Sequence, residues 1–200
     1  MALDTYAGLK AAIESYVDRD LTDNVDDFID LAEARHQREV RIREMLVRDP
    51  LLVAQRYADL PDRFLSALTI RLLTEPVTPL NHWTQERMDR NRRFQTCRPS
   101  GFTIHEQIEF DCEPDQSYSA EIIFFQSALP LSDSVETNEI LAKAPDLYLY
   151  GALSASAPWM LHDERVQMWE SMYERALIGL SNLDQRTVGT PIARVVGRGP

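Results

Sequence analysis

Residues 144–183 of the chain read APDLYLYGALSASAPWMLHDERVQMWESMYERALIGLSNL. The first part, Pro145–Ala157, is apolar almost all the way round a helix, so other elements must cover it. The second part, from about Asp163 to Leu183, carries apolar residues at steps of three and four, which is typical of an amphipathic helix. We therefore expect a buried helix that is followed, after a break at Ala157-Pro158, by an amphipathic one.

Length and charge limit the classes of protein that the chain can represent. Two hundred residues, 44% of them apolar, are enough for one domain, or one domain with arms, around a real core. The net charge of −11 repels nucleic acid and anionic membranes at long range, which argues against nucleic-acid binding as the main activity. The sequence contains neither a long apolar run nor a signal peptide, so we expect a product of the cytoplasm that has no membrane partner.

Residues that carry chemistry are few and scattered. Cys97 and Cys112 lack a zinc-binding spacing and are interpreted as two thiols in a reducing compartment. No two histidines share a helical turn, and no phosphate-binding or nucleophile motif occurs, so we expect no enzyme, metal or cofactor. His105-Glu106 could orient a base. The alternative function is therefore a small cytoplasmic enzyme or accessory binding protein with its site in the sheet near these two residues.

The N-terminal quarter predicts two helices between about residues 5 and 46. Thr5 caps the first, which ends near Val17, and Thr22 caps a longer one over Asp23–Leu46. Acidic residues occupy its first turns and arginines its later turns, as the helix dipole favours. Glutamates alternate with these arginines, which favours a solvated or subunit-facing helix over a nucleic-acid patch. The arginines concerned are Arg35, Arg38, Arg41 and Arg43.

The middle of the chain has a strand-like pattern from about residue 50 to 127. Prolines separate the short apolar runs Leu51–Val53 and Leu68–Leu73, and Thr84–Arg93 predicts a short exposed helix. Three alternating runs then predict an antiparallel meander. These runs are Phe102–His105, Gln107–Phe110 and Tyr118–Phe125.

The predicted fold class is thus α+β, mainly α: a helical bundle with a small antiparallel β-sheet insertion and an extended C-terminal arm. Residues 1–183 form a single domain, with helices at about 5–46 and 138–183 and the β-rich insertion at about 50–127. Residues 184–200 are rich in glycine and valine and have a small positive charge. They favour a frayed terminus and an arm that orders on a partner about equally.

The order of elements resembles the head-to-tail adaptor (connector) proteins of tailed bacteriophages. The similarity extends over nearly the whole chain, including the opening helices, and is weakest between Pro76 and Cys97. The most specific block is Ala144–Leu153, preceded by Asn138 and Leu141. The other matching residues are Leu60–Phe64, Tyr118–Gln126, Leu129–Asp133, Asp163–Arg165 and the helix that carries Trp169, Tyr173, Ala176 and Leu177.

The resemblance implies a structural protein of the virion neck, made in the host cytoplasm. Such adaptors form a ring, commonly a dodecamer, under the portal. They extend the channel through which DNA is ejected, without binding it specifically, and they present a docking surface to tail or nozzle proteins during tail assembly. The arm would bind the portal, and the four arginines named above would meet a neighbouring subunit. The arm residues expected to contact the portal are Val188, Ile192, Arg194, Val195, Val196 and Arg198. A third alternative is an unrelated helical interaction module of bacterial origin.

Overall fold

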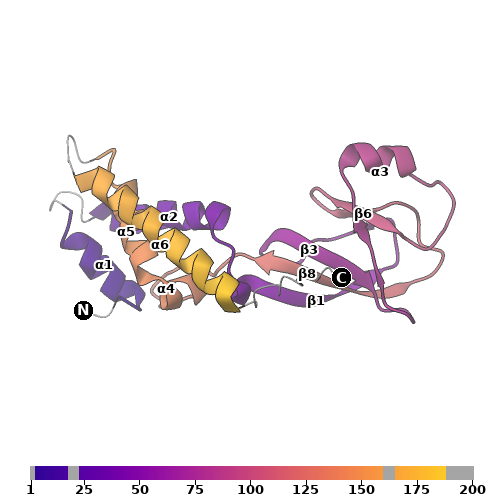
Figure 1. The fold of residues 1–200 in the computed structure, drawn as a ribbon, viewed down its shortest axis with the longest axis horizontal. Helices are drawn as coiled ribbons and strands as arrows, with labels where there is room; N and C mark the ends of the chain where they lie inside the picture. Colours follow the sequence, from indigo (N-terminus) through magenta and orange to yellow (C-terminus); the bar gives the residue numbers. More distant parts are fainter. Residues whose placement is uncertain (1–2, 18–22, 160–164, 188–200) are drawn as a thin grey trace, which may run out of the picture. The chain divides into compact units, whose positions relative to one another are not determined.

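The structure is a computed structural model that describes residues 3–17, 23–159 and 165–187, with side chains up to residue 183. The chain divides into two compact units (Figure 1). Unit 1 comprises Met1–Arg43 and Ala128–Pro200, and unit 2 comprises Glu44–Ser127. Helices account for 42% and strands for 25% of the chain, so the prediction of a mainly helical bundle is wrong and the fold is mixed α/β.

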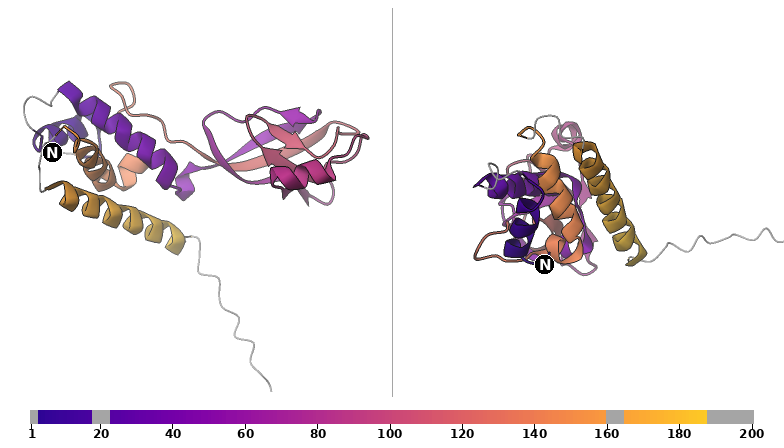
Figure 2. Two further views of the ribbon diagram at one scale, coloured as in Figure 1. Left: turned by 90° about the horizontal axis from the view of Figure 1, so that it is seen from above. Right: turned by 90° about the vertical axis from the view of Figure 1, so that its left-hand side faces the viewer.

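Helix α5 (Pro145–Ala155) is the centre of unit 1. It packs against α1 (Tyr6–Glu14), α2 (Val25–Glu39) and α6 (Arg165–Thr187), as the end-on view in Figure 2 shows. Leu147, Ala152 and Leu153 are fully buried, which confirms the predicted buried helix. Pro145 stands in the first turn, where its missing N–H leaves no donor unpaired.

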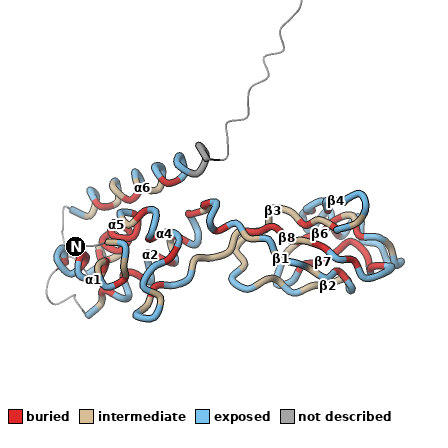
Figure 3. Tube along the Cα trace, turned by 90° about the horizontal axis from the view of Figure 1, so that it is seen from below, coloured by how far each residue is buried: buried red, intermediate tan, exposed pale blue. Residues whose placement is uncertain are grey.

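Helix α6 is amphipathic, as predicted. In α6, Trp169, Tyr173 and Leu180 are buried while the residues between them are exposed or intermediate, so burial alternates along the helix in Figure 3. The short helix α4 (Glu139–Lys143) precedes α5, and the Asn138 side chain caps it by accepting bonds from the N–H groups of Ile140 and Leu141.

A buried polar network fixes α2 against α5 and the preceding loop. The Glu33 carboxylate accepts hydrogen bonds from the Leu131 N–H (2.8 Å) and the Tyr148 hydroxyl (3.1 Å). The amide of Asn138 donates to the Tyr148 oxygen at 2.7 Å and to the Leu129 carbonyl at 2.8 Å. Burial raises the pKa of Glu33 above its usual range. Its hydrogen bonds are therefore what make this acidic side chain tolerable in the core.

Helix α2 is shorter than predicted. It ends at Glu39, and after a single 3-10 turn at Arg43–Met45 the chain enters strand β1 (Leu46–Val53). The prediction of a helix that continues to Leu46 is therefore wrong. Pairing of β1 with another strand along its whole length outweighs local helix propensity, and Pro50 is tolerated because β1 lies at the edge of its sheet.

Within the described residues, unit 2 holds two four-stranded sheets. The first has the order β1-β8-β3-β4 and is antiparallel throughout. The second has the order β2-β7-β6-β5, in which only β5 and β6 run parallel. The remaining bounds are β2 Tyr57–Ala58, β3 Phe64–Leu72, β4 Thr78–Pro79, β5 Asn81–His82, β6 Gly101–Ile104, β7 Ile108–Phe110 and β8 Tyr118–Gln126, with α3 at Gln85–Asn91.

One hydrophobic core joins the two sheets. Alternate residues of β8, among them Ile122 and Phe124, point into it and meet Phe102 and Phe110 from the second sheet. The predicted strands and the predicted short helix are all present, but the meander is wrong. Only β6 and β7 pair with each other, whereas β8 leaves them to lie between β1 and β3.

A disulfide bond and close packing fix the loop before β6. Cys97 and Cys112 form a disulfide with their Cα atoms 6.0 Å apart, so the expectation of two thiols is wrong. A sequence separation of 15 residues does not reveal which backbone segments the fold places side by side. Gly101 is required here, because a Cβ at this position would lie 2.6 Å from ring atoms of Trp83.

Candidate interaction surfaces

Arg35 forms its contacts within its own subunit. Its guanidinium makes two hydrogen bonds to the Glu170 carboxylate, at 2.6 and 2.9 Å, and one of 3.1 Å to Glu39. It also lies 3.7 Å from the centre of the Tyr173 ring. Hydrogen bonding from Arg35 lowers the pKa of Glu170. Arg35 therefore joins α2 to α6 inside unit 1, a role that the spacing of the arginines does not predict.

Of the other three arginines, only Arg38 lies on the same helix. Arg38 is exposed on the last turn of α2. Arg41 lies beyond the helix and donates to the carbonyls of Gln37 and Val40, at 2.8 and 2.6 Å. Arg43 begins the 3-10 turn. Because α2 ends at Glu39, Arg41 and Arg43 are not part of the helix on which they were predicted, and Arg38 is exposed on its last turn.

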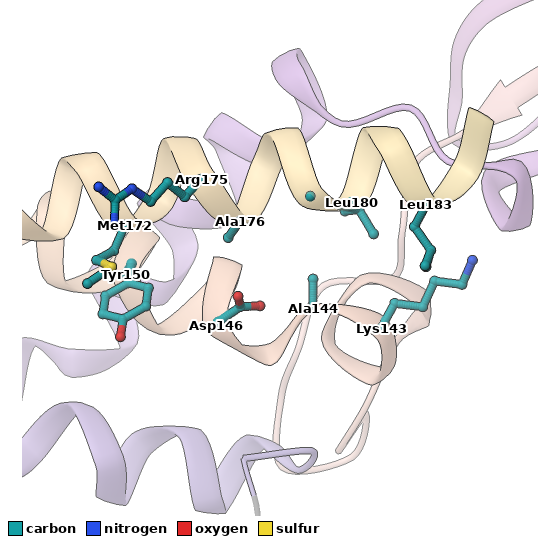
Figure 4. Close-up of a pocket in the computed structure, with 10 residues that line it drawn as sticks. Lys143, Ala144, Asp146, Tyr150, Met172, Arg175, Ala176, Leu180 and Leu183 are labelled. Carbon is teal, nitrogen blue, oxygen red and sulfur yellow. The ribbon is translucent and has the colours of Figure 1, made fainter. Parts of the chain in front are cut away.

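A groove lies between α5 and α6 on the described part of unit 1. Its volume is about 500 Å³. Figure 4 shows side chains of α6 pointing toward the α4–α5 junction across it. Lys143 lies at one end, with Leu183 above it, and Met172 meets Tyr150 at the other. The lining is Lys143, Ala144, Asp146 and Tyr150 on one side and Met172, Arg175, Ala176, Gly179, Leu180 and Leu183 on the other.

Gly179 stands out within this groove. A Cβ built at this position meets nothing within 4 Å. Glycine inside a helix costs about 1 kcal/mol relative to alanine, and no contact within the subunit accounts for its presence here.

Unit 2 carries its own exposed apolar side chains. Phe94, in the loop after α3, is 89% exposed and follows two arginines, Arg92 and Arg93. Leu52 and Leu68 are more than half exposed on the strands of the first sheet. Single exposed apolar side chains are common on protein surfaces, so these residues do not by themselves define a contact surface.

The region of His105 and Glu106 forms a hollow of about 360 Å³ that also includes Tyr57, Gln107 and Glu109. The Glu109 carboxylate lies 3.4 Å from the Arg56 guanidinium and 3.6 Å from that of Arg92. The Nε2 atom of His105 is hydrogen-bonded to the side-chain oxygen of Gln85. Glu109 and His105 are thus engaged with neighbouring side chains.

Buried titratable groups lie elsewhere. His36 is enclosed by Tyr148, at 4.5 Å between ring centres, and by Tyr173, at 6.0 Å. Burial, assisted by the positive charge of Arg35, lowers the pKa of His36 to about 4. The imidazole is therefore a neutral core side chain at physiological pH and has no access to a substrate.

Two kinds of feature are absent from the described residues. Within them, no three or more His, Cys, Asp or Glu side chains gather as a metal site would require. No helix in the same part of the chain is long and apolar enough to cross a membrane. The six arm residues Val188, Ile192, Arg194, Val195, Val196 and Arg198 lie outside the described residues.

Comparison with known proteins decides the family. The family model described as SU10 adaptor protein matches residues 4–195. The chain belongs to the SU10 adaptor protein family. This confirms the resemblance to phage head-to-tail adaptors over both units, including the region where the motifs match least. No curated protein matches the chain.

Membership assigns the adaptor a structural role in a bacteriophage virion, in the neck between head and tail. It also implies interaction with portal and tail components. The surfaces described above are therefore candidates for contacts with proteins rather than for chemistry on a small molecule.

Proposed function

We propose that this adaptor forms a ring under the portal, where it joins the capsid to the tail and extends the DNA channel. The observation that carries the proposal is the family match over residues 4–195. The ring would bind the portal on one side and a tail or nozzle protein on the other. By its resemblance to phage adaptors, we expect twelve copies.

The charge of the chain supports a channel that lets DNA pass. The net charge is −11, and DNA carries a dense row of negative phosphates. A wall of the same sign attracts no phosphate and releases no counterions, so it does not hold the DNA as a basic surface would. This agrees with a channel that conducts DNA without specific binding.

The composition of residues 188–200 supports a portal-binding arm. Val188, Ile192, Val195 and Val196 would supply apolar anchors, and Arg194 and Arg198 would pair with acidic groups of the portal. Folding of such a segment on its partner would delay ring formation until a portal is present. Arg38, Arg41 and Arg43 would contact the neighbouring subunit, while Arg35 is engaged within its own.

Co-sedimentation with the portal ring tests this function. The full-length chain is compared with a chain that ends at Thr187, which retains α6 complete. We expect the full-length protein to sediment with the portal and the truncated one to remain in solution. A chain in which a Gly/Ser sequence of equal length replaces residues 188–200 is the matched control, and it should also fail to bind.

The other outcomes are equally informative. Binding by all three chains would move the portal contact from the arm to the body of the adaptor. If the full-length chain stays in solution at every portal concentration, the proposed ring under the portal is wrong.

A further inference from the structure

The groove between α5 and α6 has properties of a protein docking site. It has an apolar floor that includes Ala144, Met172 and Leu180, with cationic side chains from Lys143 and Arg175 at its margins. Leu183, which closes one end, is 53% exposed. An open, elongated apolar groove between two helices fits a ridge of side chains from a third helix.

The same chain offers a complementary ridge on the outer face of α2. Asp27, Leu31 and Ala34 are spaced four and three residues apart, so they lie in a row, with Asp30 beside them. All four are exposed, and Leu31 is 47% exposed although it is a large apolar side chain. The opposite face of α2, which includes Phe28, Ala32 and His36, is buried in the core. The ridge is therefore the side of α2 that faces away from its own subunit.

Charge and shape make the two surfaces complementary. The ridge places two carboxylates beside one leucine, whereas the groove places two cations and a single carboxylate, that of Asp146, beside its apolar side chains. Ala176 and Gly179 leave the α6 backbone accessible at the middle of the groove, and Ala34 is small enough for the helices to approach closely.

We propose that the groove between α5 and α6 receives the α2 ridge of a second copy of this chain. In that contact Leu31 enters the apolar groove near Gly179, and Asp27 and Asp30 face Lys143 and Arg175. The ridge and the groove share no residue, so the contact is heterologous and leaves a free ridge and a free groove at the two ends of a pair. Repeated contacts of this type close into a ring when the rotation between copies permits. The inference rests on the proposed ring and names the contact that builds it.

Gly179→Trp tests the groove directly. A Cβ at this position meets nothing within 4 Å, so the variant should fold, with an unfolding midpoint no lower than that of the wild type. Its indole would fill the space that Leu31 needs. Ser181→Trp is the matched control, because residue 181 is exposed on the same helix and does not line the groove. We expect Gly179→Trp to abolish self-association and Ser181→Trp to retain it.

A mixing experiment tests the pairing of groove with ridge. Gly179→Trp blocks one surface, and Asp27→Lys combined with Asp30→Lys reverses the charge of the other. Each variant alone should remain monomeric in sedimentation velocity at concentrations where the wild type associates. Their mixture should give a one-to-one pair that cannot grow, because it retains a single intact junction. The combination of both Asp→Lys changes with Lys143→Glu and Arg175→Glu should restore association.

Several results would overturn the inference. One is wild-type association by Gly179→Trp, and another is the absence of a pair in the mixture. A wild-type chain that never associates with itself, in solution or on the portal, would also overturn it. Independent binding of single copies to the portal would contradict the proposed groove contact but agree with the proposed portal contact. Association through the groove without portal binding would do the reverse.

Discussion

Acidification should destabilise unit 1 through His36. The imidazole is 1% exposed and has a pKa of about 4 in the folded protein, whereas an unfolded histidine titrates near 6.5. Between these values the unfolded chain binds the proton more tightly, so stability falls as the pH falls. The contribution of His36 is fully present above about pH 6.5 and is lost progressively toward pH 4.

The size of the effect follows from the two pKa values. Lowering the pH from about 7.5 to about 5 should remove about 2 kcal/mol of unfolding free energy through this one residue. Glu33 acts in the opposite direction, since burial raises its pKa. Wild type must therefore be compared with His36→Gln, because the contribution of Glu33 is the same in both and cancels in the difference.

The assay is urea unfolding at a series of pH values, followed by far-ultraviolet circular dichroism. Helices α1, α2, α4, α5 and α6 belong to unit 1, so the helical signal reports mainly on that unit. The stability difference between wild type and His36→Gln should shrink by about 2 kcal/mol over this pH range. Parallel pH profiles for the two proteins would refute the assignment of a buried, neutral imidazole.

Three further predictions concern the cores. Trp169→Ala should lower the unfolding free energy of unit 1 by about 3–5 kcal/mol in the same assay, because the indole is 1% exposed; a loss below about 1 kcal/mol would contradict this packing. Because the pKa of Glu33 is raised, its ionisation lowers the unfolding free energy as the pH rises above about 4.5. Glu33→Gln should make the unfolding free energy depend less steeply on pH in this range, and an unchanged dependence would contradict the burial of this carboxylate. Gly101→Ala should destabilise unit 2 by about 1–3 kcal/mol by forcing Trp83 aside, measured by hydrogen exchange of the β6 amides. Gly179→Ala is its control, and a gain of about 1 kcal/mol is expected in unit 1.

The helical core was predictable because its signals are local. The continuous apolar character of Pro145–Ala155 predicts burial, and the stripe of Phe28, Ala32 and His36 points inward as its spacing indicates. The caps at Thr5 and Asn138 follow from side chains that bond the nearest backbone N–H groups. Such features depend on residues within one or two turns of each other.

The features that were missed depend on distant partners. Strand β1 forms because Leu46–Val53 pairs with β8, more than 60 residues later, and nothing local separates it from a continuing helix. The disulfide and the position of β8 between β1 and β3 have the same origin. The pairing of Arg35 with Glu170 also joins distant segments, so the arginine pattern alone could not distinguish a subunit contact from an internal one.

The candidate surfaces were predictable to different degrees. The arginines of α2 were recognised as surface groups, and Arg38 is indeed exposed. The groove was not foreseen, because it requires the relative position of α5 and α6, which no periodicity within one helix contains. The exposure of Phe94 depends likewise on the fold of the surrounding loop.

The mass added to a purified portal ring by this adaptor tests the central claim most directly. Sedimentation of the complex over a range of adaptor concentrations gives the number of copies bound. The account predicts cooperative loading that stops at one complete ring, with no intermediate species of appreciable population. Gradual loading of independent copies, or no added mass at any concentration, would contradict a ring-forming adaptor beneath the portal.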